Sequence, residues 1–341
     1  MEFLHHLIEY TAQNWYTVIF SFLAVMVVLN FATWKLEEEL VVIWKKLKLP
    51  DWVRWWTFDA VSSSLPELLT VMVWLMSFWA AWLEIWIWTV SGSAIFNILI
   101  IPFFSILAYQ WLKKISPEKS WINRDSIFYL FSVCVFLLWL YFWELMYMSL
   151  ALIAIYIWYL FALYFDAQKN KKKNEELVNE AYDEVKNVKI SYLTIWYALV
   201  LVYLWVEVAV ACASFVWTNL WISALVVSLV ILAAVTSIPD TLLSVKSAKK
   251  WKINASLSNA VWSNIFDICI WLWVPIAIWI QFMWLNPKVD FAQNAPIFLF
   301  LVASVIFYFW IMQKKHLNRV DAIWFLSFYL IFIGYLVYIS I

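Results

Sequence analysis

Long apolar runs, separated by short polar segments, fill most of the chain. A helix needs about 20 residues to cross the roughly 30 Å hydrocarbon layer of a bilayer, and each run is about that long. The first run follows a start that has no basic segment, and no small-residue cleavage site comes after it, so we interpret it as a retained helix. The pattern predicts ten membrane spans: residues 14–34, 53–79, 84–110, 125–143, 145–165, 190–215, 219–245, 253–281, 294–313 and 320–340.

The composition excludes the soluble and the disordered classes. Of the 341 residues, 66% are hydrophobic and 13% are charged, against roughly 45–50% and about 25% in soluble domains. The net charge is zero, so no overall field attracts nucleic acid. The three cysteines lie in apolar runs without paired spacing, which disfavours a disulfide framework and a zinc site. We expect an all-α polytopic protein embedded in the lipid bilayer, with no nucleic-acid partner; the sequence indicates no protein partner.

Basic residues are confined to the loops on one side of the predicted spans. All but Lys288 of the 23 lysines and arginines follow the first, third, fifth, seventh or ninth span. Cytoplasmic loops of membrane proteins carry such an excess of positive charge. We therefore expect these loops to be cytoplasmic and both termini to lie outside, in a protein of the plasma (inner) membrane.

One long polar segment, residues 166–189, divides the chain into a first half, residues 1–165, and a second half, residues 190–341. Its mixed charges predict a solvated cytoplasmic linker with a short helix from about Asn174 to Asn187. Each half contains five spans. Because five is an odd number, equivalent helices of the two halves are expected to run in opposite directions through the membrane.

Two motifs of the first half recur in the second half in the same order. Residues 60–69, AVSSSLPELL, align with residues 233–242, AAVTSIPDTL, and residues 91–98, SGSAIFNI, align with residues 261–268, VWSNIFDI. Inverted repeats with proline-broken helices at matched positions are typical of transporters that bind their substrate near the bilayer midplane. We expect ten transmembrane helices arranged as two inverted five-helix repeats. The repeated regions extend over about 57–105 and about 230–278.

The repeated motifs supply oxygen atoms and no histidine or cysteine. Proline inside a helix removes a backbone hydrogen bond and blocks a carbonyl one turn earlier, so we expect the carbonyls of Ala60 and Ala233, or of their neighbours, to be free to face a cation. An all-oxygen set suits hard cations such as Ca²⁺ or Na⁺ and suits zinc or copper poorly. The candidate ligands are Glu67, Asp240, Asp267, Asn97, Ser63, Ser64, Ser93, Thr236, Ser237 and Ser263, with the carbonyls of Ala60 and Ala233.

Three of these candidates, Glu67, Asp240 and Asp267, are carboxylic acids within apolar spans. A lone carboxylate at the bilayer centre costs roughly 2.5–3.5 kcal/mol, and the four spans that form the repeats hold no basic residue in their interiors. We expect bound cations or protons to supply the compensating charge. The other interpretation is that the acids are held by neutral hydrogen bonds alone.

The motifs resemble those of the sodium/calcium exchangers of the cation/calcium antiporter superfamily, whose two α-repeats read G-[ST]-S-x-P-E and G-S-N-x-F-[ND]. The amino-acid sequence of residues 92–97 and 237–241 is most similar to that of the potassium-dependent branch of the family. In that branch, an acid at the position of Asp267 is implicated in potassium co-transport. The same acid occurs in prokaryotic exchangers, so potassium dependence stays open. The resemblance implies that Glu67 and Asp240 coordinate calcium and that the other candidates complete sodium and calcium sites.

By this resemblance the chain is expected to be a secondary-active antiporter, with no enzymatic activity and no cofactor, that exchanges Na⁺ for Ca²⁺ by alternating access. A proton-coupled Ca²⁺ or cation exchanger is an alternative, because the same acids can cycle protons. A passive cation channel is a further alternative. An intramembrane aspartyl protease is disfavoured, because one of the paired acids is Glu67 and the G-x-G-D type of sequence is missing.

The chain contains 2 glycines and 28 tryptophans, whereas glycine normally supplies about 7% of residues. Helices that pack inside a bilayer need small residues at their contacts. Trp262 stands where the family has glycine and where the first repeat keeps Gly92, and an indole there is expected to force apart helices whose ligands must converge. Other typical glycine positions are occupied by Trp88, Trp251, Trp271 and Trp273.

We hypothesise that the gene uses a code in which UGA means glycine, and that this sequence results from reading UGA as tryptophan. The alternative is a protein that is rich in tryptophan and forms aromatic belts at the membrane interfaces. Belts concentrate tryptophan at the ends of spans, whereas Trp74, Trp205 and Trp262 fall within spans. The codons at positions 88 and 262 decide between the two.

Overall fold

The structure is a computed structural model of the chain. It describes residues 14–49, 59–77, 82–110, 115–142, 145–168, 171–220, 223–250, 252–271 and 290–340. The beginning of the predicted span 53–79, the end of the predicted span 253–281, Trp251 and Trp273 lie outside these residues.

The regular elements among the described residues are helices, joined by turns and short irregular segments, and Ile115 and Leu317 form an isolated antiparallel bridge. Two short segments, η2 and η3, are π-helical. The elements are α2 (Trp15–Lys46), α4 (Ala60–Ser63), α5 (Leu65–Ser77), α6 (Trp82–Gln110), α7 (Lys119–Phe142), α8 (Leu145–Gln168), α9 (Lys171–Val185), α10 (Tyr192–Leu220), α11 (Ala224–Val226), η2 (Val227–Leu232), α12 (Ala233–Thr236), α13 (Ile238–Lys249), α14 (Ile253–Phe266), η3 (Asp267–Trp271), α16 (Phe291–Met312) and α17 (Arg319–Ser340).

Each of the ten predicted spans falls on one or more of these helices. Within the described residues, six helices are long and apolar enough to cross a bilayer, and a seventh span results if Ala224–Thr236 and Ile238–Lys249, which meet at 43°, form one broken span. The apolar part of α8, Leu150–Asp166, is shorter. Two further predicted spans, 53–79 and 253–281, are described only in part.

The helix α2 is longer than the apolar pattern predicts. The predicted span ends at residue 34, but the helix continues to Lys46. Lys35 and Glu38 form an ion pair one turn apart at 2.9 Å, and Trp44 is buried near the end of the helix. The predicted cytoplasmic loop after the first span is therefore mostly helical, because its polar residues favour helix and its apolar residues still have packing partners.

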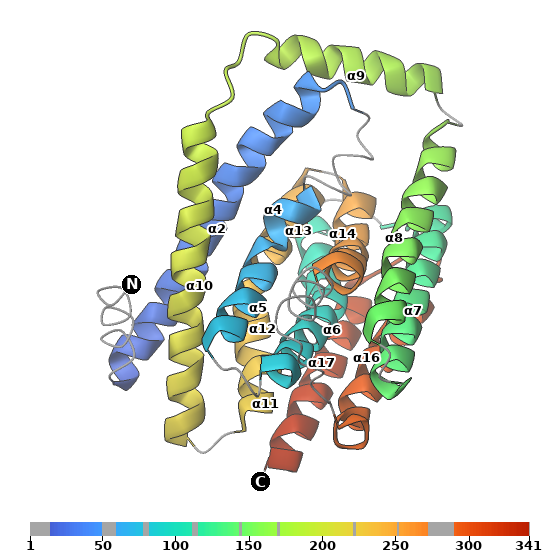
Figure 1. Cartoon of the computed structure of the whole chain (residues 1–341). Coiled ribbons are helices and arrows are strands. Elements are labelled where there is room, and N and C mark those ends of the chain that lie inside the picture. Colours follow the sequence, from blue (N-terminus) through green and yellow to red (C-terminus); the bar gives the residue numbers. More distant parts are fainter. Residues whose placement is uncertain are drawn as a thin grey trace.

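The helices surround a central group that carries the repeated motifs. Figure 1 shows α2 and α10 on one side and α7 and α8 on the other, with α5, α6 and α12–α14 between them. Inside the protein, 83% of the apolar stretch of α6 is buried, against 28% of the corresponding stretches of α2 and α17. Nearly every residue from Ser256 to Phe266 in α14 is buried as well. The polar motifs of α6 and α14 are therefore in the interior.

Apolar side chains cover the outside of the outer helices. Large apolar residues such as Phe20 on α2, Leu193 on α10 and Leu299 on α16 are more than two-thirds exposed. In water this surface would be unfavourable, whereas against lipid tails it is not. The chain is an integral membrane protein.

The linker helix α9 lies across the ends of the other helices, where the sequence predicts a short helix (Figure 1). Lys45 of α2 forms an ion pair with Glu184 of α9, and the Lys48 ammonium lies 4.3 Å from the ring centroid of Tyr182. The start of α2 and the end of α17 lie at the opposite face of the molecule (Figure 1).

Candidate functional site

Two helix breaks with the same backbone geometry form the centre of the candidate site. The first break is at Ser64, between α4 and α5, with φ −91° and ψ 4°. The second is at Ser237, between α12 and α13, with φ −84° and ψ 1°. Each serine is followed two residues later by the proline of its motif, Pro66 or Pro239. Proline lacks a backbone N–H, so neither helix can continue its regular hydrogen-bond ladder through the break.

The structure corrects one expectation about the breaks. The carbonyls of Ala60 and Ala233 are not free, because the backbone N–H of Ser64 donates to the first at 2.9 Å and that of Ser237 donates to the second at 3.1 Å. A proline at position i has no N–H to donate to the carbonyl at i−4. That carbonyl belongs to Ser62 in the first motif and to Val235 in the second, and not to Ala60 or Ala233. The Ala233 oxygen also accepts from Thr236 Oγ1 at 3.2 Å, and the Ala60 oxygen lies 3.5 Å from Ser63 Oγ. A cation contact at either carbonyl would therefore compete with these hydroxyls.

Hydroxyl groups link each break to the partner helix of the other repeat. Ser64 Oγ lies 3.1 Å from Ser263 Oγ of α14, and Ser237 Oγ lies 2.7 Å from Ser93 Oγ of α6. In the alignment of the repeats Ser64 corresponds to Ser237, and Ser263 corresponds to Ser93. The two contacts are therefore equivalent, and the two halves of the site are built in the same way.

The two lead acids have one pair of equivalent hydroxyl partners, Ser93 for Glu67 and Ser263 for Asp240. Glu67 Oε1 accepts hydrogen bonds from Ser237 Oγ at 3.2 Å and from Ser93 Oγ at 3.5 Å. Asp240 Oδ2 accepts from Ser263 Oγ at 2.6 Å and from Asn97 Nδ2 at 3.3 Å. Both carboxylates are buried, with 2% and 0% of their residue surface exposed. Each acid is thus held on one oxygen by neutral donors.

The remaining acidic and amide oxygens of the site have no donor. Among the described residues, no lysine or arginine forms an ion pair with the three acids. Glu67 lies close enough to Asp267 and Asp240 for their negative charges to repel one another. An unpaired buried acceptor costs about 1–3 kcal/mol, and more when it is charged. Within the described part of the site, the buried carboxylate and amide oxygens without a hydrogen-bond donor are Glu67 Oε2, Asn97 Oδ1, Asp240 Oδ1 and Asp267 Oδ1 and Oδ2.

Two candidate hydroxyls are directed at their own helices. Ser63 Oγ donates to the Asp59 carbonyl at 2.9 Å, and Thr236 Oγ1 donates to the Ala233 carbonyl at 3.2 Å. In the described part of the chain, no three His, Cys, Asp or Glu side chains surround one point closely enough to hold a metal ion.

Asn264 also belongs to the site, although it is not among the ligand candidates that the repeated motifs indicate. Its Nδ2 donates to the Ala94 carbonyl at 2.9 Å and to the Tyr129 hydroxyl at 3.0 Å, and its Oδ1 accepts from Asn97 Nδ2 at 3.2 Å. The Asn264 amide thereby fixes the orientation of the Asn97 amide, whose Oδ1 has no donor among the described residues. Its place within the Ser263-Asn264-x-Phe266-Asp267 motif was the available signal.

We expect Asn264→Ala to weaken Ca²⁺ binding about tenfold without abolishing it. The substitution leaves Asn97 Nδ2 with one partner fewer and leaves the Ala94 carbonyl without this donor, a loss of about 1–3 kcal/mol. Equilibrium binding to the purified protein measures the effect. Asn219→Ala is the matched control, because Asn219 is exposed at the end of α10 and donates only within its own turn. Equal affinities for the two variants would contradict the positioning role.

Two of the tryptophans at expected glycine positions, Trp262 and Trp88, are accommodated, contrary to one expectation. The Trp262 indole is buried and donates to Asp125 Oδ2 of α7 at 2.8 Å, while the next residue, Ser263, still contacts its partners in the site. Asp125 also pairs with Arg124 at 2.8 Å. Trp88 donates to Asn294 Oδ1 at 2.6 Å. The buried indole nitrogen of Trp271, by contrast, has no acceptor among the described residues.

Gly92, the counterpart of Trp262 in the first repeat, occupies a position where only glycine fits. A Cβ atom at Gly92 would lie 2.3 Å from the Leu229 carbonyl oxygen and 2.7 Å from Leu229 Cα. These are backbone atoms of η2, which a side-chain rotation cannot move away. The counterpart of Leu229 in the first repeat is residue 56, which lies outside the described residues. The recoding hypothesis therefore stays a prediction.

The fold and this interior define a polytopic helical membrane protein whose buried centre is lined by carboxylate, amide and hydroxyl oxygens. The sequence profile of the sodium/calcium exchanger protein family matches residues 14–165 and 190–338. The chain belongs to this family of membrane exchangers, which confirms the resemblance seen in the motifs.

Individual relatives match over part of their length. The chain is 30% identical to sodium/potassium/calcium exchanger 1 of Gallus gallus over 146 residues, 42% of this chain and 20% of that protein. It is 33% identical to the Homo sapiens protein of the same name over 135 residues, 36% of this chain and 11% of that protein. The matched part of the chain thus covers no more than a fifth of these relatives.

Solved structures share the fold over nearly the whole chain. Native YfkE superposes with a TM-score of 0.66 at 17% identity, covering 94% of this chain and 90% of that one. The H⁺/Ca²⁺ exchanger CAX gives 0.65 at 14% identity, with 92% and 81% covered. The sodium-calcium exchanger NCX_Mj gives 0.55 at 20% identity, with 93% and 98% covered. At these identities the likeness describes the fold.

Proposed function

We propose that the chain is a secondary-active antiporter that exchanges Na⁺ for Ca²⁺ by alternating access. The observation that carries the proposal is the set of buried oxygens without donors on Glu67, Asn97, Asp240 and Asp267. Such oxygens are costly unless a cation or a proton occupies the site. Their hard, all-oxygen chemistry suits Ca²⁺ and Na⁺. Membership of the exchanger family supports the same cargo.

Competition for shared ligands would couple the two ions. Glu67 and Asp240 carry the charge that attracts either one divalent ion or several sodium ions, and they cannot satisfy both sets at once. A ligand shifts a conformational equilibrium only by its differential affinity for the two states. In the proposed cycle the ions stay in the central helices α4–α6 and α12–α14 while α2 and α10 move across them to open the site to one side and then to the other.

The proposal includes an arrangement in the membrane. The ten spans would form two inverted five-helix halves, residues 1–165 and 190–341, which the paired contacts Ser64–Ser263 and Ser237–Ser93 support. The repeats would occupy about 57–105 and about 230–278. The linker 166–189 would lie in the cytoplasm and both termini outside the plasma membrane, in agreement with the distribution of basic residues.

Uptake of ⁴⁵Ca²⁺ into proteoliposomes tests the proposal. We expect uptake to require an outward Na⁺ gradient and to stop when that gradient is collapsed. Uptake that follows an imposed pH gradient and ignores Na⁺ would replace sodium coupling by proton coupling. Flux that is independent of any opposing ion would indicate a channel. Repeating the sodium experiment with and without K⁺ decides whether potassium is co-transported. We include K⁺ because part of the chain is 30% identical in sequence to sodium/potassium/calcium exchanger 1.

A further inference from the structure

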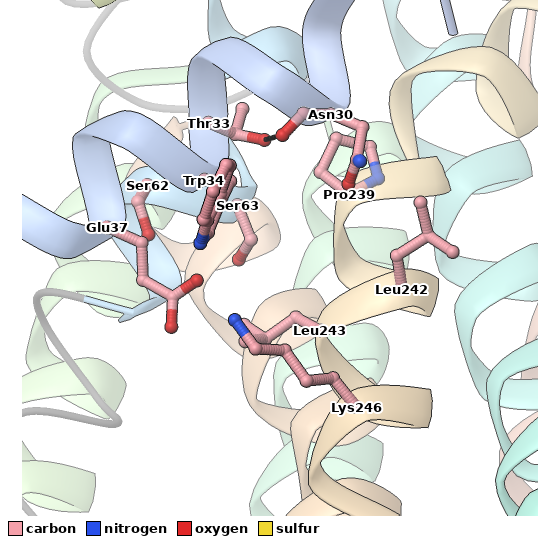
Figure 2. Close-up of a pocket in the computed structure, with 10 residues that line it drawn as sticks. All are labelled: Asn30, Thr33, Trp34, Glu37, Ser62, Ser63, Pro239, Leu242, Leu243 and Lys246. Carbon is pink, nitrogen blue, oxygen red and sulfur yellow. Dashed lines mark hydrogen bonds between the residues drawn. The ribbon is translucent and has the colours of Figure 1, made fainter. Parts of the chain in front are cut away.

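A hollow leads from the side of the linker helix to the candidate site. It has a volume of about 400 Å³ and lies between α2 and α13, with Ser62, Ser63 and Pro239 at its inner end (Figure 2). Ser63 is one of the candidate ligands, and Pro239 directly precedes Asp240 in the chain. We call this space the inner hollow.

A second hollow adjoins it toward the linker side. This outer hollow has a volume of about 480 Å³ and shares Glu37, Leu243 and Lys246 with the inner one. Asp59 and Asn259 also line it, and Asn259 Nδ2 lies 3.4 Å from the Asp240 carbonyl. Because they share walls, the two hollows adjoin, and together they extend from the basic loop at the end of α13 to Ser63. We call the two hollows together the linker-side route.

Two opposite charges face each other where the hollows meet. Figure 2 shows the Glu37 carboxylate of α2 and the Lys246 ammonium of α13 both directed into the inner hollow. The ammonium lies 5.9 Å from the ring centroid of Trp34. The outer hollow has further charges of both signs, on Glu38, Lys250 and Lys252. A cation on this route therefore passes the mixed charges of the outer hollow and then Lys246 and Glu37 before it reaches Ser63.

We propose that this route is the linker-side entrance for the transported cations, and that Lys246 and Glu37 set the rate of entry. The inference rests on the proposed antiport function. Positively charged side chains in a narrow passage lower the local concentration of cations, and negatively charged side chains raise it. One unit charge at this range is expected to change entry of a divalent cation about three- to tenfold and entry of a monovalent cation by about the square root of that factor. Neither residue is a ligand of the ion.

Replacement of the lysine by cysteine tests the proposal with a charge that can be restored. Lys246→Cys is made in a Cys134→Ser background, since Cys134 is the exposed cysteine while Cys212 and Cys269 are buried. In everted vesicles, where the linker side faces the bath, Ca²⁺ uptake at subsaturating Ca²⁺ should rise about three- to tenfold. A cationic, membrane-impermeant thiol reagent should return the rate to its original value, and an anionic one should raise it further. Right-side-out vesicles should show no change.

Matched variants separate this effect from a general one. Lys249 lies on the same helix, is exposed and does not line either hollow, so Lys249→Cys should leave all rates unchanged. Glu37→Gln should lower entry from the linker side by a factor similar to the rise in Lys246→Cys. If exchange is normal but Lys246→Cys does not change the rate of Ca²⁺ uptake, the proposed entrance is wrong. It is also wrong if the two thiol reagents change that rate equally. Either result would leave the proposed antiport function unaffected. Absence of exchange in the unmodified protein would overturn both.

Discussion

Glu67→Gln and Asp240→Asn are each expected to lower Na⁺-driven Ca²⁺ uptake by about 100-fold or more. The two acids come from different halves of the chain, are buried, and each has one oxygen without a donor. Removing one member of a buried pair of opposite charges costs about 3–5 kcal/mol, which corresponds to a loss of about 100-fold or more. The amide keeps the size and the hydroxyl contacts of the acid, so the loss measures the charge. Initial rates of ⁴⁵Ca²⁺ uptake in proteoliposomes provide the measurement.

A stability measurement distinguishes loss of binding from loss of folding. Without Ca²⁺, an amide at position 67 removes a repelling buried charge, so Glu67→Gln should melt at the same temperature as the unmodified protein or higher. Added Ca²⁺ should raise the melting temperature of the unmodified protein and leave the variant unaffected. Glu180→Gln on the exposed face of α9 is the control and should behave as the unmodified protein. Full uptake by either site variant would contradict the shared role of the two acids.

Gly92→Ala is expected to prevent correct packing of the central helices. The new Cβ would lie 2.3 Å from the Leu229 carbonyl oxygen, so α6 and η2 would have to move apart. Overpacking of a well-packed core costs about 1–3 kcal/mol and occasionally more, and here the displaced helix also carries Ser93 and Asn97. We expect less monodisperse protein in detergent, a lower melting temperature and little Ca²⁺ uptake. Gly334→Ala is the matched control, because a Cβ there would meet no atom within 4 Å. Normal folding of Gly92→Ala would show that the close approach is not required.

The same reasoning extends to position 262 through the recoding hypothesis. The two repeats correspond residue by residue, so the tight packing at Gly92 is expected at its counterpart. If UGA encodes glycine in the source organism, the codons at 88 and 262 are UGA, and a protein made with glycine at these positions should be more stable than one made with tryptophan. UGG codons at both positions would end the hypothesis. In that case the hydrogen bond from Trp262 Nε1 to Asp125 Oδ2 would be a native contact of the protein.

Much of the site was predictable because its signals are local. The Ser-x-Pro-acid order fixes both helix breaks, and the second copy of each motif identifies the partner residues without knowledge of the fold. The role of Asn264 was not predictable in this way, since its partners Ala94 and Tyr129 lie on other helices. The expectation of free carbonyls at Ala60 and Ala233 was wrong for these two residues, because the carbonyl that proline at position i leaves without a donor is that of residue i−4.

The length of α2 and the linker-side hollow also required the structure. Residues 35–46 are polar enough to predict a loop, and only their packing shows that the helix continues. Glu37 and Lys246 are far apart in sequence and each resembles an ordinary charge at a helix end. Their position across one hollow depends on the packing of α2 against α13, which no periodicity in either segment reveals.

Equilibrium binding of ⁴⁵Ca²⁺ to the purified protein, titrated with Na⁺, tests most directly whether acids from both halves share the transported cations. We predict that Na⁺ displaces Ca²⁺ completely and with a steepness that requires more than one sodium ion. We also predict that Glu67→Gln and Asp240→Asn each remove the binding, although the two residues belong to different repeats. Ca²⁺ that stays bound in saturating Na⁺, or that binds normally to either variant, would contradict a common site at the centre of the membrane.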